Sequence, residues 1–280
     1  MLKKLVRRLA WSGGAALAVY AMLLIYIFFG QEQMIFHKAP VAQDHDYGFG
    51  AQVSHHFLNR PDGARLHGVI HPARGERRGV VVYYKGNAGN VGNGRRMADT
   101  FTGMGFDVVA MDHRGYGKSR GDLSESAFLG DGLAWYDWAR SRYPGEDVRV
   151  VGYSLGTTLA AHVVHKRDPG NVILFAPMRS VLHLGKARYP FVPDFISRFP
   201  LRSDLRLSEN NDSILIYHGN QDRIIPPSSA LALKPVLDDS DHFMMVAGAT
   251  HASIPWEKAV LRDIHRRWGR TTEMAIAISD

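Results

Sequence analysis

Short apolar runs that alternate with amphipathic stretches constrain the fold of this chain more than any other feature of its sequence. The runs are rich in β-branched residues and apolar on both faces, as strands buried in a parallel sheet are. The predicted strands are 79–84, 106–111, 148–151, 172–175, 213–217 and 242–246, and the predicted helices are 93–104, 124–142, 154–166, 228–237 and 257–267. An earlier pair, 53–58 and 66–71, flanks Pro61-Asp62-Gly63 and indicates a hairpin. The sequence therefore predicts an α/β fold with one doubly wound, mostly parallel sheet and an antiparallel N-terminal edge.

Residues 9–30 contain no charged side chain. As a helix rising ~1.5 Å per residue, this segment would span roughly 33 Å, which is enough to cross a hydrocarbon core of ~30 Å. The alternative is a cleaved signal peptide, whose apolar stretch is typically ~7–15 residues. The small-x-small site at 16–18 lies inside the apolar run, so cleavage there would leave an apolar terminus. An uncleaved transmembrane anchor is the favoured interpretation.

The basic residues before this segment predict its orientation. Lys3, Lys4, Arg7 and Arg8 precede it, whereas Glu32 is the first charged residue after it. Positive residues flanking a membrane helix remain on the cytoplasmic side. We therefore expect a single-pass membrane protein with a cytoplasmic N-terminus and an extracytoplasmic C-terminal domain, periplasmic if the source is bacterial.

The same four residues account for most of the formal charge of +7. The rest of the chain carries 30 basic and 27 acidic side chains, a balance that argues against a nucleic-acid surface. The segment 112–119 ends in Gly-Lys-Ser, like a phosphate-binding loop, but Asp112 stands where that loop requires glycine. Nucleic-acid binding and NTP hydrolysis are therefore excluded as interpretations.

The chain of 280 residues has no cysteine, which excludes disulfides, thiolate catalysis and cysteine zinc sites. His162 and His165 lie one helical turn apart, but no nearby carboxylate completes a metal site and no HExxH motif is present. We expect neither a metal nor a cofactor.

The predicted organisation has four parts. Residues 1–30 form the basic tail and anchor, and 31–50 form a connector with no clear periodicity, expected to act as a flexible tether spanning roughly 25 Å. Residues 51–270 form the α/β domain, with an insertion at about 177–212 between two predicted strands, and 271–280 form a tail.

One motif carries the predicted chemistry. The strand at 148–151 runs directly into Gly152-Tyr153-Ser154-Leu155-Gly156, which is followed by a predicted helix. In this strand–turn–helix context, Gly-x-Ser-x-Gly is typical of a sharp turn that presents a serine hydroxyl at the carboxyl end of a strand. Ser154 is therefore the candidate nucleophile.

A nucleophilic serine needs a base, and the base needs a group that orients it. Asp222 follows the strand at 213–217, and His251 follows the strand at 242–246. Both residues therefore lie at carboxyl ends of strands, on the same sheet edge as Ser154. The order serine, acid, histidine predicts a Ser154–Asp222–His251 triad. The oxyanion hole is expected from the backbone N–H of Leu155 and one N–H of the glycine-rich loop 85–92.

With these residues identified, the chain resembles the α/β-hydrolase superfamily, and within it the Bem46-like membrane-anchored serine hydrolases grouped with serine aminopeptidase-type domains. The resemblance covers about 31–268 and rests on 33–36, 86–90, 112–119, 152–156, the Asp222 loop and His251. It implies that Asn87 and Leu155 supply the oxyanion amides and that the chain hydrolyses an acyl ester, thioester or amide. Two positions depart from the family pattern: Lys85 replaces the usual histidine, and Asn210-Asn211-Asp212 stand where a proline is common.

The predictions about the substrate come from the insertion and from Lys85, and not from a catalytic motif. In this fold the insertion covers the active site, so Tyr189, Phe191 and Phe195 are candidate acyl-binding residues, and Lys85 is a candidate for attracting an anionic head group. The expected partners are a small-molecule or lipid-derived acyl substrate and the membrane, and the oligomeric state is left open. Two alternatives remain: a catalytically silent hydrolase fold that serves as a membrane-tethered binding module, and acyl transfer by the same triad.

Overall fold

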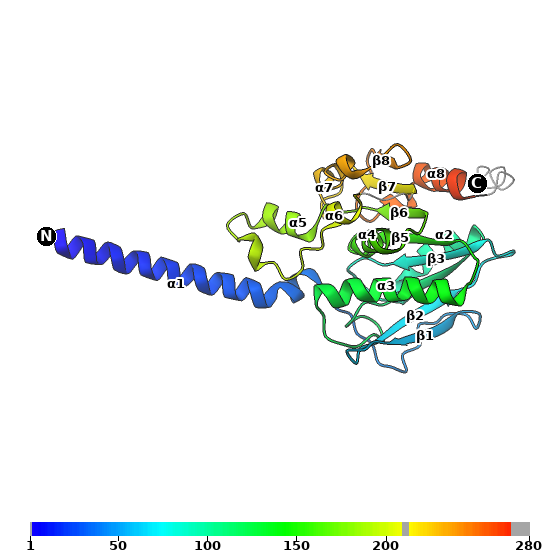
Figure 1. Cartoon of the computed structure of the whole chain (residues 1–280), viewed down its shortest axis with the longest axis horizontal. Helices are drawn as coiled ribbons and strands as arrows, with labels where there is room; N and C mark the ends of the chain where they lie inside the picture. The colour runs from blue at the N-terminus through cyan, green and yellow to red at the C-terminus, as the bar shows by residue number, and fades with distance from the viewer. Residues whose placement is uncertain (1, 209–212, 270–280) are drawn as a thin grey trace.

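The computed structural model describes residues 2–208 and 213–269 of the chain. A single long helix, α1 (Leu2–Ile35), extends from one end of an α/β domain that contains all the strands (Figure 1). Helix α1 is long and apolar enough to cross a membrane, and most of its apolar window is not buried by the rest of the chain. The predicted tail 271–280 and residues 209–212 of the predicted insertion lie outside the described residues.

One eight-stranded sheet organises the domain, in the order β1-β2-β4-β3-β5-β6-β7-β8. Strands β1 and β2 form the predicted antiparallel hairpin, and β2 also runs antiparallel to β4, whereas all pairs from β4 to β8 are parallel. The strands are β1 Ser54–Asn59, β2 Arg65–His71, β3 Gly79–Tyr84, β4 Phe106–Met111, β5 Val148–Tyr153, β6 Asn171–Phe175, β7 Ser213–Gly219 and β8 His242–Val246. The predicted fold class is confirmed.

Helices cover both faces of this sheet. The α-helices after α1 are α2 Arg95–Gly103, α3 Glu125–Arg142, α4 Gly156–Arg167, α5 Val181–Arg188, α6 Ser203–Arg206, α7 Pro227–Leu231 and α8 Lys258–Trp268. Shorter 3-10 turns are η1 Val91–Gly94, η2 Asp194–Ile196, η3 Lys234–Val236 and η4 Ile254–Trp256. Helices α3 and α4 pack on one face, and α2 and α8 pack on the other.

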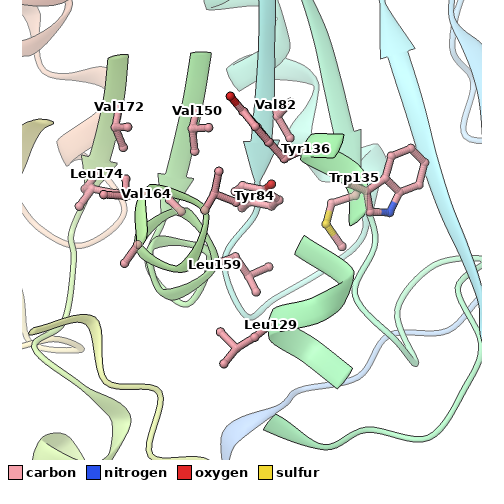
Figure 2. Packing of buried hydrophobic residues seen from close by; sticks show 14 of the residues in the cluster. Val82, Tyr84, Leu129, Trp135, Tyr136, Val150, Leu159, Val164, Val172 and Leu174 are labelled. Carbon is pink, nitrogen blue, oxygen red and sulfur yellow. The ribbon is translucent and has the colours of Figure 1, made fainter. Parts of the chain in front are cut away.

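The side chains of β3 explain why its sequence is apolar without alternation. Val80 and Val82 point into the core beneath α3 and α4, where Trp135 and Leu159 are completely buried (Figure 2). Val81 and Tyr83 point into the opposite core with residues of α2 and α8. Because both faces of a parallel sheet are covered, the strand buries every side chain.

The elements differ from the sequence prediction in two places. The predicted helix 228–237 is divided into α7 and η3, because Pro235 has no N–H to continue the helical hydrogen bonds. The insertion contains the short helices α5 and α6, which were not predicted.

The connector is attached to the domain more tightly than a flexible tether would be. Helix α1 continues to Ile35, and Phe36 follows directly with only 2% of its surface exposed. The Phe36 ring packs against those of Phe128 and Phe199, at centroid distances of 5.2 and 5.0 Å. Further along, the N–H of Val41 donates to the carbonyl of Gly117 at 2.9 Å. Burial of Phe36 therefore joins the anchor helix directly to the core.

Glycines let α4 begin against the backbone of β3. A Cβ added at Gly156 would overlap the carbonyl oxygen of Tyr84 and lie 2.6 Å from that of Lys85. A Cβ at Gly152 would lie 2.8 Å from the Cα of Thr157. Both glycines of the Gly-x-Ser-x-Gly motif are thus required by close approach of one backbone to another.

We expect Gly156→Ala to destabilise the domain by about 3 kcal/mol or more, because the backbone of β3 must move to admit the methyl group. Gly103→Ala, at the end of α2, is the matched control, since no atom lies within 4 Å of its added Cβ. The control should leave stability unchanged or raise it by up to about 1 kcal/mol. Thermal unfolding of both variants in detergent measures the difference, and equal midpoints would contradict the close-approach argument.

Candidate active site

Ser154 occupies the sharp turn between β5 and α4. Its backbone has φ 53°, a left-handed conformation that a non-glycine residue adopts at a cost of about 1–3 kcal/mol. The turn is held by the Ser154 N–H, which donates to the carbonyl of Phe175 at 2.9 Å. This backbone conformation presents the hydroxyl at the carboxyl edge of the sheet while keeping the residue 7% exposed.

The structure brings the three predicted triad residues together. Nε2 of His251 lies 2.9 Å from Oγ of Ser154, and Nδ1 of His251 lies 2.7 Å from Oδ2 of Asp222. Ser154 and His251 are 97 residues apart in the sequence. They meet because β5, β7 and β8 are parallel strands whose carboxyl ends share one edge.

Backbone N–H groups of the loop that carries Asp222 fix the orientation of its carboxylate. Its Oδ1 accepts the backbone N–H groups of Ile224 and Ile225, each at 2.8 Å, which leaves Oδ2 for His251. Burial alone would raise the pKa of the Asp222 carboxyl, but these hydrogen bonds and the one from His251 outweigh burial and lower that pKa. His218 steadies the same loop, since its Nε2 lies 3.0 Å from the carbonyl of Ile225.

This arrangement defines what each nitrogen of His251 can do. An ionised carboxylate can only accept, so Nδ1 must carry the hydrogen that points to Asp222. The lone pair of Nε2 is then free to accept the hydroxyl hydrogen of Ser154. The imidazole is thus oriented to remove a proton from Ser154.

Tyr153, the residue before Ser154, also contacts His251. Its hydroxyl donates to the backbone carbonyl of His251 at 3.1 Å, and the two rings lie 5.3 Å apart. The residue before the serine therefore helps to position the loop after β8.

The loop after β3 lies directly against Ser154. A Cβ placed at Gly86 would lie 3.3 Å from the Cβ of Ser154, so the absence of a side chain there permits the approach. Within 2–208 and 213–269, the backbone N–H groups of Asn87 and Leu155 donate to no protein acceptor. These are the two amides that the sequence nominated for an oxyanion hole.

The side chain of Asn87 has a separate role that the sequence did not reveal. Its Oδ1 accepts the hydroxyl of Tyr116 at 2.7 Å and the backbone N–H of His37 at 3.0 Å. The loop beside Ser154 is therefore tied to the turn after β4 and to the segment that follows α1.

Two residues of the turn after β4 also hold this loop. Oδ1 of Asp112 accepts the N–H of Val91 at 2.8 Å, and Nε2 of His113 lies 3.1 Å from the carbonyl of Lys85. Burial, with the nearby charge of Lys85, lowers the pKa of His113 well below its ordinary value, so the ring is neutral and donates to that carbonyl. The segment that imitates a phosphate-binding loop thus acts as a support for the loop beside Ser154.

Lys85 does not present its charge to solvent. Only 4% of the residue is exposed, and its ammonium group lies 3.3 and 3.5 Å from the carbonyls of Gly86 and Ala88 and 4.0 Å from the ring centroid of Tyr116. Burial lowers the pKa of Lys85 to about 8, while the Asp112 carboxylate opposes that shift. Because the ammonium group of Lys85 is buried, it offers no exposed charge to support the predicted attraction of an anionic head group.

The aromatic residues of the insertion lie beside α1. Tyr189 lines a cavity of about 330 Å³ between α1 and the insertion, and the carbonyl of Phe191 accepts the hydroxyl of Tyr20 at 2.7 Å. Phe195 is 83% exposed. The role of these three aromatic residues in binding an acyl group stays a prediction.

Among the described residues there is no group of three or more histidine, aspartate or glutamate side chains arranged to hold a metal ion.

The chain is similar to known proteins over most of its length. Residues 75–200 match the family model for serine aminopeptidase, S33. An uncharacterised protein of Mycobacterium tuberculosis is 28% identical over 196 residues, covering 68% of this chain and 69% of the relative. The chain belongs to the α/β-hydrolase superfamily. By class it is a serine hydrolase.

Other members of the superfamily extend the comparison. The lysophosphatidylserine lipase ABHD12 of Xenopus tropicalis is 30% identical over 168 residues, which cover 52% of this chain but only 44% of that lipase. An esterase of Pyrococcus furiosus shares the fold with a TM-score of 0.64 at 16% identity, covering 83% of this chain and 98% of the esterase. Est1E of Butyrivibrio proteoclasticus has a TM-score of 0.62 at 18% identity, covering 79% and 99%.

The buried charge of Lys85 leads to a pH-dependent prediction. The pKa of Lys85 in the folded chain, about 8, lies below its ordinary value of 10.5. Between these two values the unfolded chain binds more protons than the folded chain, so this group makes stability rise with pH. Lys85→Met removes the contribution, and its stability relative to wild type should therefore fall by about 3 kcal/mol from pH 8 to pH 10.5.

Thermal unfolding in detergent across this pH range measures the difference. Lys258→Met, at the exposed start of α8, is the matched control and should track wild type throughout. A Lys85→Met profile parallel to that of Lys258→Met would show that the Lys85 ammonium is not desolvated.

Proposed function

We propose that this superfamily member hydrolyses carboxylic esters through a Ser154–His251–Asp222 triad. The observation that carries the proposal is the continuous chain from Oδ2 of Asp222 through the His251 ring to Oγ of Ser154, with distances of 2.7 and 2.9 Å. In the first step, Nε2 of His251 takes the hydroxyl proton as Oγ bonds to the substrate carbonyl carbon.

The tetrahedral intermediate then collapses. The C–O bond to the leaving alkoxide breaks, His251 returns the proton to that oxygen, and the acyl group remains on Ser154. A water molecule repeats the sequence, giving up a proton to His251 and its oxygen to the acyl carbon, which releases the carboxylic acid and restores Ser154. Asp222, whose carboxyl pKa is lowered, remains ionised and stabilises the imidazolium at both steps.

The backbone N–H groups of Asn87 and Leu155 are proposed to bind the negative charge that develops on the substrate carbonyl oxygen. Their support is the contact of Gly86 with Ser154 and the absence of another acceptor among the described residues. Leu155 also precedes α4, so its amide lies at the positive end of a helix. Donors fixed before the reaction begins stabilise an oxyanion without reorganisation.

For the substrate, we propose an acyl ester derived from lipid, in preference to a peptide. Helix α1 would hold the domain at a bilayer, and the relatives include a lysophosphatidylserine lipase. Initial rates on short- and medium-chain acyl esters should exceed those on peptide amides. Faster turnover of a peptide amide than of every ester tested would favour a peptidase instead.

The membrane arrangement belongs to the same proposal. Helix α1 would cross the bilayer with Lys3, Lys4, Arg7 and Arg8 in the cytoplasm, and the domain from β1 onward would lie on the other side. The continuous helix Leu2–Ile35 supports this proposal, since its uncharged part is long enough to span the hydrocarbon.

The catalytic proposal is tested with a fluorophosphonate, which reacts with activated serines. Wild type should be labelled, and Ser154→Ala should not. His251→Ala should lose ~10³-fold or more in kcat, because triad members act as a unit. Ser141→Ala, exposed in the last turn of α3, is the control and should retain both labelling and turnover. Equal labelling of wild type and Ser154→Ala would remove the serine from the mechanism.

The orientation is tested in bacterial cells with reporters fused after residue 268. Alkaline phosphatase, which needs disulfides formed outside the cytoplasm, should be active there, and a reporter that functions only in the cytoplasm should be silent. Replacing the four basic residues before the anchor with asparagine should weaken this preference. A reversed pattern in the unaltered chain would overturn the proposed orientation.

A further inference from the structure

The insertion between β6 and β7 is bound along the side of α1. The hydroxyl of Tyr20 donates to the carbonyl of Phe191 at 2.7 Å. The side-chain amide of Gln31 donates to the carbonyl of Ile196 and accepts the N–H of Arg198, both at 2.8 Å. Figure 1 shows α5 and the chain after it lying alongside the part of α1 nearest the domain.

The position of Tyr20 shows how far this contact reaches. Tyr20 lies within the uncharged segment 9–30, ten residues before its end at Gly30. At ~1.5 Å per residue, the tip of the insertion therefore lies about 15 Å along the helix from Gly30. If the uncharged segment occupies the hydrocarbon, the Phe191 end of the insertion lies at a depth that lipid tails occupy.

The exposed side chains at this tip suit lipid and not water. Phe191 is 50% exposed and Phe195 is 83% exposed. Pro190 precedes them, and Val192, Pro193 and Asp194 lie between them. Two large aromatic side chains projecting from one short segment are unfavourable in water. The bond between Tyr20 and Phe191 also satisfies a hydroxyl and a carbonyl that would otherwise be costly to place in hydrocarbon.

One charged group of the insertion lies where head groups would be, and two others neutralise each other. The guanidinium of Arg198 lies 5.6 Å from the ring centroid of Phe28, close to the end of the uncharged segment. Lys186 and Asp194 pair with each other at 2.5 Å, which reduces the cost of bringing either near the bilayer. Long basic side chains can keep their apolar stems in lipid while their charged ends reach the interface.

We propose that the segment 189–196 enters the lipid bilayer beside α1, as a second membrane contact of the same chain. The apolar cavity of about 330 Å³ lies between this segment and the helix, with Ile27, Met34, Val192 and Ile196 among its walls. The inference rests on the membrane-crossing helix of the proposed function but not on any catalytic residue. The insertion thus serves as a membrane-embedded element.

The absence of cysteine allows a direct test in the full-length chain. A nitroxide label is attached to Phe195→Cys, and its collisions with oxygen, which concentrates in hydrocarbon, are compared with those with a water-soluble nickel chelate, in phosphatidylcholine vesicles. Met22→Cys, 60% exposed on α1, is the control for a label in the bilayer. Ser141→Cys is the control for a label in water, since it lies in the last turn of α3 and is exposed.

The oxygen-to-nickel ratio at position 195 is expected to exceed that at position 141 several-fold. It is expected to lie below that at position 22, because the neighbouring Ile196 is bound at the level of Gln31. A ratio at 195 equal to that at 141 would overturn the inference while leaving the anchor intact. A label at 195 shielded from both reagents would also overturn it, because a second copy of the chain would then cover the aromatic residues. A water-like ratio at position 22 would refute the anchor itself and the inference with it. An unchanged thermal midpoint in each labelled chain shows that the labels do not unfold the domain.

Discussion

The contact between the backbone of Gly156 and the carbonyl of Tyr84 is the constraint on which the site depends. It brings the start of α4 to the end of β3, so the turn that holds Ser154 and the loop that begins at Lys85 share one small volume. Ser154 can adopt its left-handed backbone because glycines on either side leave room for the crossing. Ser154 and the backbone N–H of Leu155 are therefore positioned by the close packing of one backbone on another.

A second layer of interactions fixes the loop after β3. Asp112 and His113 bind it from the turn after β4, and the side chain of Asn87 binds Tyr116 of the same turn. Burial of Lys85 adds a charge whose hydrogen bonds end on carbonyls of this loop. These contacts hold the loop beside Ser154, and the N–H of Asn87 has no protein acceptor among the described residues.

The sheet, and the proximity of the three residues proposed as a triad, could be predicted from the sequence for one physical reason. Parallel strands place their carboxyl ends on one edge, so Ser154, Asp222 and His251 could be brought together from their positions after β5, β7 and β8 alone. Burial was not predictable in the same way: Lys85 is recognisable as a charge, but its enclosure by Tyr116 and two carbonyls depends on tertiary packing. The contact between α1 and the insertion could not be predicted from the sequence either. Tyr20 and Gln31 bind backbone carbonyls there, and every residue has a backbone carbonyl.

Phe36 has a mechanical consequence. The Phe36 ring packs against the rings of Phe128 and Phe199 immediately after α1. Rotation of the helix relative to the domain would therefore break the packing of Phe36. Each residue of an α-helix turns the chain by about 100° and advances it by about 1.5 Å. If α1 crosses a bilayer as proposed, the number of residues between the membrane boundary and Phe36 sets both the height of Ser154 above the bilayer and the direction in which the site faces around the membrane normal.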